Sequence, residues 1–228
     1  MTKQINILST KKLLPNQKQV LLNANFNIIE ENFIETKIKT FELSTTNDNL
    51  IFTSQNAVQS ILNHPKCEEF ITKLREKNVF SVGMKTKDLL TENGFNVVAY
   101  TGYAQDLAEI ISLIYSQETF TFFSGNLRRD VLPTTLKENR IKFNEIEVYE
   151  TEVTSKKIKQ KLDGILFFSP SAVESFLKLN TIKDEICFCI GETTAEALEE
   201  KKIKNVIISD KQSVENVILE VIEHYNNY

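Results

Sequence analysis

Short apolar runs alternate with amphipathic helical patterns along the whole chain. A short apolar run bounded by small polar residues is typical of a buried strand, and apolar residues three and four positions apart indicate a helix. The last helix, Val214–Tyr225, shows this helical spacing. Strands that alternate with helices predict parallel sheets. The predicted strands are Gln4–Leu8, Ile28–Ile34, Asn49–Phe52, Val79–Val82, Asn96–Ala99, Thr119–Phe123, Lys142–Glu150, Gly164–Phe168, Ile186–Ile190 and Val206–Ile208.

The chain also contains an internal repeat in two parts. The segment LIFTSQNAVQSIL (Leu50–Leu62) returns as ILFFSPSAVESFL (Ile165–Leu177), and FSVGMKTKDLL (Phe80–Leu90) returns as FCIGETTAEAL (Phe188–Leu198). Each copy is a predicted strand that stops at small polar residues and is followed at once by a helix. A repeat of this kind predicts two related α/β units rather than one large sheet.

Two segments, Phe26–Thr36 and Ile141–Thr151, are longer, more acidic, and alternate apolar with polar residues. That pattern favours an antiparallel ribbon with one exposed face, which would connect the units twice. The predicted fold class is therefore α/β, with two similar, flavodoxin-like parallel-sheet lobes joined by a two-stranded antiparallel ribbon. The expected boundaries are 1–34 plus 152–228 for the first domain, 37–146 for the second, and 28–37 with 146–152 for the ribbon.

Composition narrows the class of protein. With 228 residues, 41% hydrophobic and 25% charged, the chain is a globular protein of one or two domains. A net charge of -4 argues against a general nucleic-acid binder but leaves room for a local basic cluster. The N-terminus lacks the pattern of a signal peptide, and no apolar stretch approaches the ~20 residues that span a bilayer. We therefore expect a cytoplasmic protein that binds neither nucleic acid nor membrane.

The cysteines and histidines offer little for metal or nucleophilic chemistry. Cys187 and Cys189 alternate on a predicted strand and so point to one buried face, and together with Cys67 they are expected to be reduced core residues. The two histidines, His64 and His224, are far apart in the sequence. The chain therefore has too few clustered cysteines and histidines for a zinc site or a histidine-based triad, and no metal is expected.

Six junctions between predicted strands and helices carry short hydroxyl or amide side chains. A single Ser or Thr at such a place is most often only an N-cap. Six junctions together favour a shared surface of helix N-termini that binds an anionic ligand, either a carboxylate or a phosphate. Neither GxGxxG nor GxxxxGK[ST] is present, which argues against a nucleotide-dependent dehydrogenase or kinase. The junctions are 9–12, 53–56, 83–86, 124–126, 169–171 and 191–194.

The most distinctive stretch that is not repeated is FFSGNLRRDVLPTTL. Arg128 and Arg129 are predicted to open a helix, where a cation opposes the helix dipole. A bound anion would resolve that conflict. Alternatively, both guanidinium groups point to solvent or pair with Asp130 and Glu138. The sequence leaves these two interpretations open.

The run SGNLRRDVLPTTLKENRIKFNEIEVYET, with TSQNAV, VGMKT, FFSPSAV and IGETTAEAL at these spacings, resembles the uroporphyrinogen-III synthase family over nearly the whole chain. The resemblance implies two α/β domains joined by a two-stranded ladder. It also implies a cofactor-independent, cyclising hydro-lyase of porphyrin and haem biosynthesis, expected as a monomer. The substrate would be hydroxymethylbilane, a linear tetrapyrrole with eight carboxylates. The product would be uroporphyrinogen III, formed with inversion of ring D and loss of water.

The resemblance also places the site. Tyr149 would be the acid that assists water loss, although a tyrosine on a ribbon can equally be a packing residue. Lys11 stands where the family often has arginine, and the glycine that usually closes the helix after the GxTTA motif is absent from EALEEKKIKN. The substrate contacts that the resemblance implies are Lys11, Ser54, Asn56, Thr86, Asn126, Arg129, Ser169, Thr193 and Thr194.

Two other classes of protein remain open. A two-lobed binding protein that closes on an anionic small molecule would have the same duplicated lobes and the same donors. A receiver-like interaction module would share the α/β pattern, but the acidic cluster expected at its strand ends is missing. Turnover separates the enzyme from the binder, because uroporphyrinogen I forms spontaneously from the linear substrate and only an enzyme redirects it to isomer III.

Overall fold

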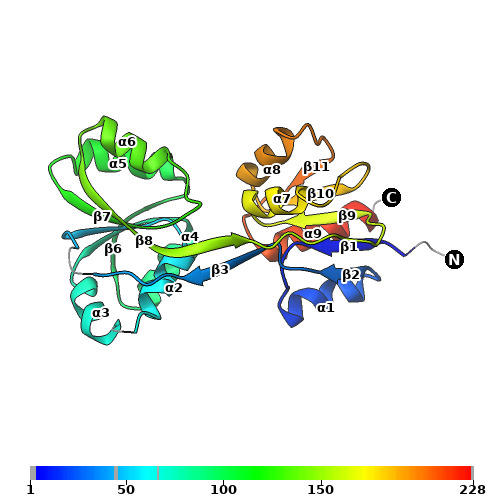
Figure 1. The fold of residues 1–228 in the computed structure, drawn as a ribbon, viewed down its shortest axis with the longest axis horizontal. Helices are drawn as coiled ribbons and strands as arrows, with labels where there is room; N and C mark the ends of the chain where they lie inside the picture. The colour runs from blue at the N-terminus through cyan, green and yellow to red at the C-terminus, as the bar shows by residue number, and fades with distance from the viewer. Residues whose placement is uncertain (1–3, 44–45, 66, 227–228) are drawn as a thin grey trace. The chain divides into compact units, whose positions relative to one another are not determined.

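The computed structural model describes residues 4–43, 46–65 and 67–226 of the chain (Figure 1). The chain divides into two compact units, one made of Met1–Glu35 with Glu152–Tyr228 and the other of Thr36–Thr151. Each unit has a mostly parallel sheet with helices packed on both faces. The predicted α/β fold with parallel-sheet lobes is therefore confirmed.

The first unit has a five-stranded sheet in the order β11-β10-β9-β1-β2, with neighbouring strands parallel. Helices α1 and α9 cover one face and helices α7 and α8 cover the other. The strands are β1 (Asn6–Ser9), β2 (Asn27–Glu30), β9 (Gly164–Phe167), β10 (Ile186–Cys189) and β11 (Val206–Ile208). The helices are α1 (Pro15–Asn23), α7 (Pro170–Leu177), α8 (Glu192–Glu199) and α9 (Val214–Asn226).

The second unit has the strand order β3-β8-β7-β4-β5-β6. Helices α2, α3 and α4 pack on one face, and helices α5 and α6 pack on the other. The strands are β3 (Ile34–Ile38), β4 (Asn49–Phe52), β5 (Asn78–Val82), β6 (Asn96–Thr101), β7 (Thr119–Gly125) and β8 (Lys142–Val153). The helices are α2 (Gln55–Leu62), α3 (Cys67–Arg75), α4 (Met84–Glu92), α5 (Ala104–Ile114) and α6 (Val131–Glu138).

The sequence repeat corresponds to a repeat in the topology. Its copies are β4-α2 and β9-α7, followed by β5-α4 and β10-α8. Counted along the chain, the first sheet has the flavodoxin-like order 2-1-3-4-5, whereas β4 to β8 have the order 3-2-1-4-5. The two orders become identical when β9, β10, β11, β1 and β2 are matched to β4, β5, β6, β7 and β8. The units are thus circular permutations of one arrangement.

The repeated strands are central in their sheets, which explains their continuous apolar sequence. Every residue of β4 and of β9 is buried, as expected for strands covered by helices on both faces. Cys187 and Cys189 lie in one buried cluster with Phe167 and Phe176, so the prediction that both thiols face the same layer is confirmed. Burial raises the pKa of both thiols, that of Cys189 to about 12. The side chain of Cys67 lies outside the described residues.

The prediction of one strand over Ile28–Ile34 is wrong. Residues 27–30 form β2, which runs parallel to β1, and a second strand, β3, begins at Ile34 and neighbours β8. The strand is interrupted between them at Phe33, whose side chain has no exposed surface. The centres of the Phe33 and Phe176 rings are 5.4 Å apart. Burial of this one side chain in the first unit overrides the alternating pattern around it.

Strand β3 pairs with β8 in the antiparallel sense. The Thr154 N–H donates to the Phe33 carbonyl at 3.0 Å, and the Lys39 N–H donates to the Val148 carbonyl at 3.0 Å. The residue numbers on the two strands thus run in opposite directions. These two strands carry the chain from the first unit to the second and back again.

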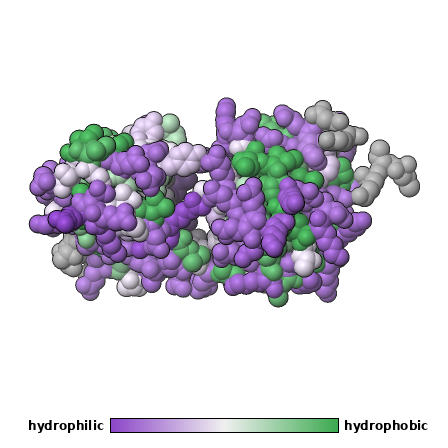
Figure 2. Space-filling model, turned by 90° about the horizontal axis from the view of Figure 1, so that it is seen from above, coloured by the Kyte–Doolittle hydropathy of each residue, from purple (hydrophilic) through white to green (hydrophobic). Residues whose placement is uncertain are grey.

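On the face drawn in Figure 2, hydrophilic side chains dominate and hydrophobic patches lie between them. Within the described part of the chain, none of the helices combines the length and the hydropathy needed to cross a membrane.

Candidate functional site

Each sheet has one point where its strand order reverses. In the first unit this point lies between β9 and β1, and in the second it lies between β4 and β7. Ligands of open parallel sheets bind outside the carboxyl ends of the strands beside such a point. The permuted repeat therefore gives the chain two equivalent candidate sites, one in each unit.

Nine of the ten residues singled out from the sequence follow the carboxyl ends of strands, and the tenth, Tyr149, lies within β8, opposite the last residue of β7. In the first unit the residues follow the neighbouring strands β1, β9 and β10, and in the second unit the other five follow β4, β5 and β7. The first group is Lys11, Ser169, Thr193 and Thr194. The second group is Ser54, Asn56, Thr86, Asn126, Arg129 and Tyr149.

In the first unit the loop after β1 is tied to β9. Thr10 is buried, and both its backbone N–H and its hydroxyl donate to the Leu166 carbonyl, at 3.2 and 2.7 Å. This places the Lys11 ammonium 4.6 Å from the centre of the Phe168 ring, a cation–π distance. Phe168 directly precedes Ser169, so the structure brings Lys11 next to the start of α7.

Ser54 and Ser169 are helix N-caps, as the commonest interpretation of such residues predicts. The Ser54 hydroxyl accepts from the Asn56 N–H at 3.0 Å, and the Ser169 hydroxyl accepts from the Ala172 N–H at 3.2 Å. Asn56 itself is exposed in the first turn of α2. These two hydroxyls stabilise the helix ends that point toward the candidate sites.

Helices α4 and α8 begin differently, because glycine is their N-cap and neither has a capping side chain. Gly83 has φ 85°, a left-handed conformation that favours glycine. The backbone N–H groups of Thr86 and Thr194 donate to the carbonyls of these glycines, at 3.1 and 3.0 Å. The Thr86 and Thr194 side chains are buried, and Thr193 is half-buried. An uncapped first turn is suited to an anionic group.

The expectation that Arg128 and Arg129 open a helix is wrong. Helix α6 begins at Val131 with Asp130 as its N-cap, so both arginines lie in the turn before it. Arg128 pairs with Asp130, as one interpretation predicted, and its other partner is Glu145 of β8 rather than Glu138. The Arg128 guanidinium binds both carboxylate oxygens of Glu145, with Nη2 2.9 Å from Oε2. The pairing of β7 with β8 brings Glu145 next to Arg128, and this pairing cannot be read from the sequence. Arg129 is exposed.

The Arg128–Glu145 pair changes the titration of both groups. Burial alone would raise the pKa of Glu145, but hydrogen bonds from Arg128 and Ser124 hold the pKa below its usual value of 4.5. The pKa of Arg128 is raised correspondingly, chiefly through its hydrogen bond to Glu145. A carboxyl whose folded pKa is lowered stabilises the fold above its unfolded pKa, and that stability is lost as the pH falls through the folded pKa.

Glu145→Gln is therefore expected to lower the free energy of unfolding by about 1–2 kcal/mol near neutral pH. The difference from wild type should shrink at pH values below 4.5 as Glu145 becomes protonated. Urea unfolding at about pH 7 and about pH 3.5 measures both effects. Glu147→Gln is the matched control, because its partner Lys39 and Glu147 are 41% and 40% exposed and such a pair contributes little. Equal differences at both pH values would contradict this account.

Tyr149 lies against the carboxyl end of β7. Its ring is half-buried, packs on the cluster that contains Phe52 and Phe123, and covers Gly125. A Cβ atom on Gly125 would be 2.3 Å from two carbons of the Tyr149 ring. The Asn126 side chain makes two hydrogen bonds with the backbone of Thr151. Sequence reasoning selected Tyr149 and Asn126 but missed Gly125, since its role depends on the pairing of β7 with β8.

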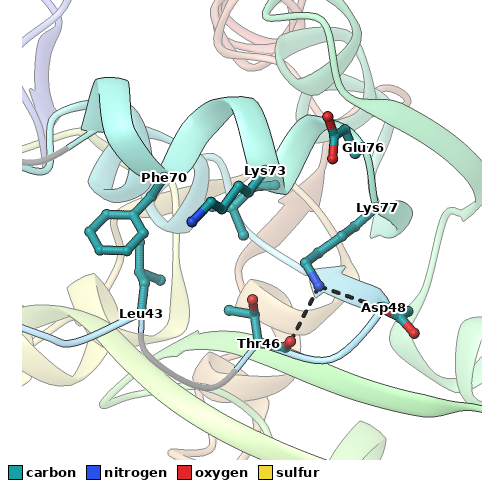
Figure 3. Close-up of a pocket in the computed structure, with 8 residues that line it drawn as sticks. Leu43, Thr46, Asp48, Phe70, Lys73, Glu76 and Lys77 are labelled. Carbon is teal, nitrogen blue, oxygen red and sulfur yellow. Dashed lines mark hydrogen bonds and ion pairs between the residues drawn. The ribbon is translucent and has the colours of Figure 1, made fainter.

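A pocket of about 540 Å³ lies elsewhere, at the amino ends of β4 and β5 (Figure 3). It is lined by Phe70 and Lys73 of α3 and by Lys77, whose ammonium is 3.2 Å from the Thr46 carbonyl and 3.5 Å from Asp48. Lys77 thereby fixes the segment that leads into β4. The pocket is therefore at the end of the sheet opposite to where parallel sheets bind ligands.

Comparison with known proteins agrees with this geometry. The family model described as "Uroporphyrinogen-III synthase HemD" matches residues 18–218. The uroporphyrinogen-III synthase of Saccharomyces cerevisiae is 26% identical over 211 residues, which cover 78% of this chain and 76% of the yeast protein.

Two solved structures share the fold. The crystal structure of uroporphyrinogen-III synthetase from Helicobacter pylori has a TM-score of 0.71 at 23% identity and covers 97% of this chain and 100% of its own. A mutant uroporphyrinogen III synthase from the extremely thermophilic bacterium Thermus thermophilus has a TM-score of 0.72 at 14% identity, with coverage of 98% and 100%. Identities this low show the fold alone. The family model, in contrast, spans most of the sequence, and the chain belongs to the uroporphyrinogen-III synthase family.

Proposed function

We propose that this protein cyclises hydroxymethylbilane to uroporphyrinogen III, with inversion of ring D and loss of one water, as a cytoplasmic monomer. The family match over residues 18–218 is the observation that carries the proposal. The geometry supports it, because polar side chains and helix N-termini lie at the carboxyl ends of both sheets. A substrate with many separate carboxylates needs donors at many places rather than a single phosphate cradle.

The reaction begins with departure of hydroxide from the hydroxymethyl group, which leaves an azafulvene electrophile. The electron-rich pyrrole supplies most of the driving force, so a weak acid and correct folding of the substrate suffice. A spiro intermediate then fragments and recombines with ring D inverted. The overall change releases one water and involves no oxidation or reduction, so the proposed reaction balances without a cofactor.

Within this scheme Tyr149 is the proposed general acid, which gives its proton to the departing hydroxide. Lys11 supplies a positive charge beside α7, and the backbone N–H groups in the uncapped first turns of α4 and α8 donate hydrogen bonds to substrate carboxylates. The distribution of donors over several loops follows from the fold, since each parallel strand ends in its own loop. The proposed contacts are Lys11, Ser54, Asn56, Thr86, Arg129, Ser169, Thr193 and Thr194, with Asn126 considered separately below.

Product analysis tests the function directly. Purified protein without added metal or nucleotide is expected to convert hydroxymethylbilane mainly to uroporphyrinogen III. Chromatography of the oxidised porphyrins separates isomers I and III, and the same incubation without protein gives the spontaneous isomer I. Isomer I alone, formed at the uncatalysed rate, would contradict the proposed catalysis.

A further inference from the structure

Gly125 is a glycine because of its neighbour and not because of its backbone. Its φ lies outside the left-handed region, so an L-residue fits the backbone conformation there. A Cβ atom, however, would be 2.3 Å from Cε2 and Cζ of Tyr149 and 2.8 Å from its hydroxyl oxygen. Among the six glycines of the chain this is the closest approach. The Tyr149 ring occupies the space that any side chain at position 125 would need.

A β-bulge turns Tyr149 toward Gly125. In the pairing of β7 with β8, Ser124 lies opposite Glu147 but Gly125 lies opposite Tyr149, so Val148 is the extra residue. Successive residues of a regular strand point to opposite faces, yet Val148 and Tyr149 both pack on the same hydrophobic cluster. Bulges of this kind redirect a side chain and are frequent beside active sites.

Asn126 fixes the backbone beyond the tyrosine. Its Oδ1 accepts from the Thr151 N–H at 2.8 Å, and its Nδ2 donates to the Thr151 carbonyl at 3.2 Å. The side-chain amide thus extends the pairing of β7 with β8 by one step past Gly125. One N–H group of Nδ2 and one lone pair of Oδ1 are thus used within the protein, so Thr151 sets the orientation of the Asn126 amide.

We propose that Gly125 and Asn126 are positioning residues for Tyr149: Gly125 provides the space in which the ring lies, and Asn126 holds the strand that carries it. The inference rests on the proposed role of Tyr149. A general acid has to be within hydrogen-bond reach of the group it protonates, and a displacement of about 1 Å can cost about 100-fold in rate. The two residues therefore act on turnover through the place of the tyrosine hydroxyl.

The position of the ring is measured by ¹⁹F NMR on protein labelled with 3-fluorotyrosine. The chain has six tyrosines, and the Tyr149 resonance is the one that Tyr149→Phe removes. Gly125→Ala is expected to shift this resonance, and Asn126→Ala to shift or broaden it. Gly102→Ala is the matched control, because no atom lies within 4 Å of a Cβ built there. An unchanged Tyr149 resonance in Gly125→Ala overturns the proposal, whatever the activity of the enzyme.

Kinetics on unlabelled protein with hydroxymethylbilane provide the second readout. Gly125→Ala is expected to lower kcat by about 100-fold with little change in KM. In a Tyr149→Phe background the same change should cost no further kcat, since the hydroxyl to be positioned is gone. An equal loss of kcat in that background overturns the proposal for Gly125. For Asn126→Ala, a raised KM that persists in the Tyr149→Phe background identifies a substrate contact and overturns the positioning role.

A failure to fold is also informative. If Gly125→Ala does not fold, Tyr149→Ala combined with Gly125→Ala is expected to fold, because the ring that the new methyl group overlaps is absent. If Tyr149→Ala alone folds and the double variant does not, the backbone at position 125 requires glycine and the proposal is overturned. Normal turnover in Tyr149→Phe alone contradicts the proposed acid, whereas the ¹⁹F shift still decides whether Gly125 positions the ring.

Discussion

Tyr149→Phe is expected to lower kcat by about 10²–10⁴-fold while KM and the free energy of unfolding stay near the wild-type values. The substitution removes the hydroxyl that would protonate the departing hydroxide and keeps the ring that packs over Gly125. An interaction that acts only in the transition state affects kcat rather than KM. Steady-state rates with hydroxymethylbilane and urea unfolding of the same preparation measure the three quantities.

Tyr103→Phe is the matched control for this substitution. Tyr103 is 48% exposed at the start of α5, in the same unit, and its change should leave kcat unaltered. If Tyr149→Phe keeps near-normal turnover, the pyrrole and ordered water drive the loss of hydroxide. The protein would then act chiefly by folding its substrate into the reactive conformation.

In Phe33→Ala the core of the first unit is expected to open about 100–4,000 times more often than in the wild type. Removing a buried phenylalanine side chain costs about 3–5 kcal/mol, and each 1.4 kcal/mol is a factor of ten in the opening equilibrium. Phe33 has no exposed surface and lies in the cluster that also contains Cys187 and Cys189. Their thiols are buried, so labelling by a maleimide reports the opening of this unit.

The labelling is measured in a Cys67→Ala background, which leaves these two thiols as the reactive groups. Phe33→Leu is the control, because a hydrophobic change that keeps most of the volume usually costs less than about 1.5 kcal/mol. A labelling rate in Phe33→Ala equal to that of the wild type would mean that Phe33 does not hold the first unit together.

Much of the fold could be predicted because its central strands repeat. The predicted strand Asn49–Phe52 and the strand Val206–Ile208 have the bounds that the structure shows, and the repeated segments occupy matching places in the two sheets. Local signals suffice for such elements, since an apolar run followed by a serine N-cap defines a strand, a turn and a helix start.

Two of the wrong predictions have the same physical origin, a contact between residues that are distant in the sequence. The alternating pattern around Ile28–Ile34 shows no break, because only the burial of Phe33 against Phe176 interrupts the strand there. The sequence suggests Asp130 and Glu138 as partners of the arginines; Asp130 does pair with Arg128, but strand pairing supplies Glu145 in place of Glu138. Strand register is invisible to a local pattern.

The candidate site shows the same division. Residues at the ends of parallel strands, such as Lys11 and Ser169, can be found by their position after an apolar run. The role of Gly125 could not be predicted, because it depends on a bulge at Val148 in the neighbouring strand. A glycine after a strand end is a common turn residue, and only the pairing partner shows that a ring occupies the space beside it.

The permuted arrangement has a consequence for synthesis on the ribosome. Strands β1 and β2 emerge first from the ribosome. The other partner of β1 is β9, where Ile7 pairs with Gly164, so the sheet cannot form around β1 until most of the chain has been translated. All strands of the second unit are complete once residue 153 has emerged, and domains generally fold as units during synthesis. Pairing of β3 with β8 then joins Phe33 to Thr154 by a hydrogen bond. Because the second unit is then folded, residues 33 and 154 are held next to each other and the residues between them no longer act as a long flexible loop. This lowers the entropic cost of bringing β1 and β2 to the strands that are translated last.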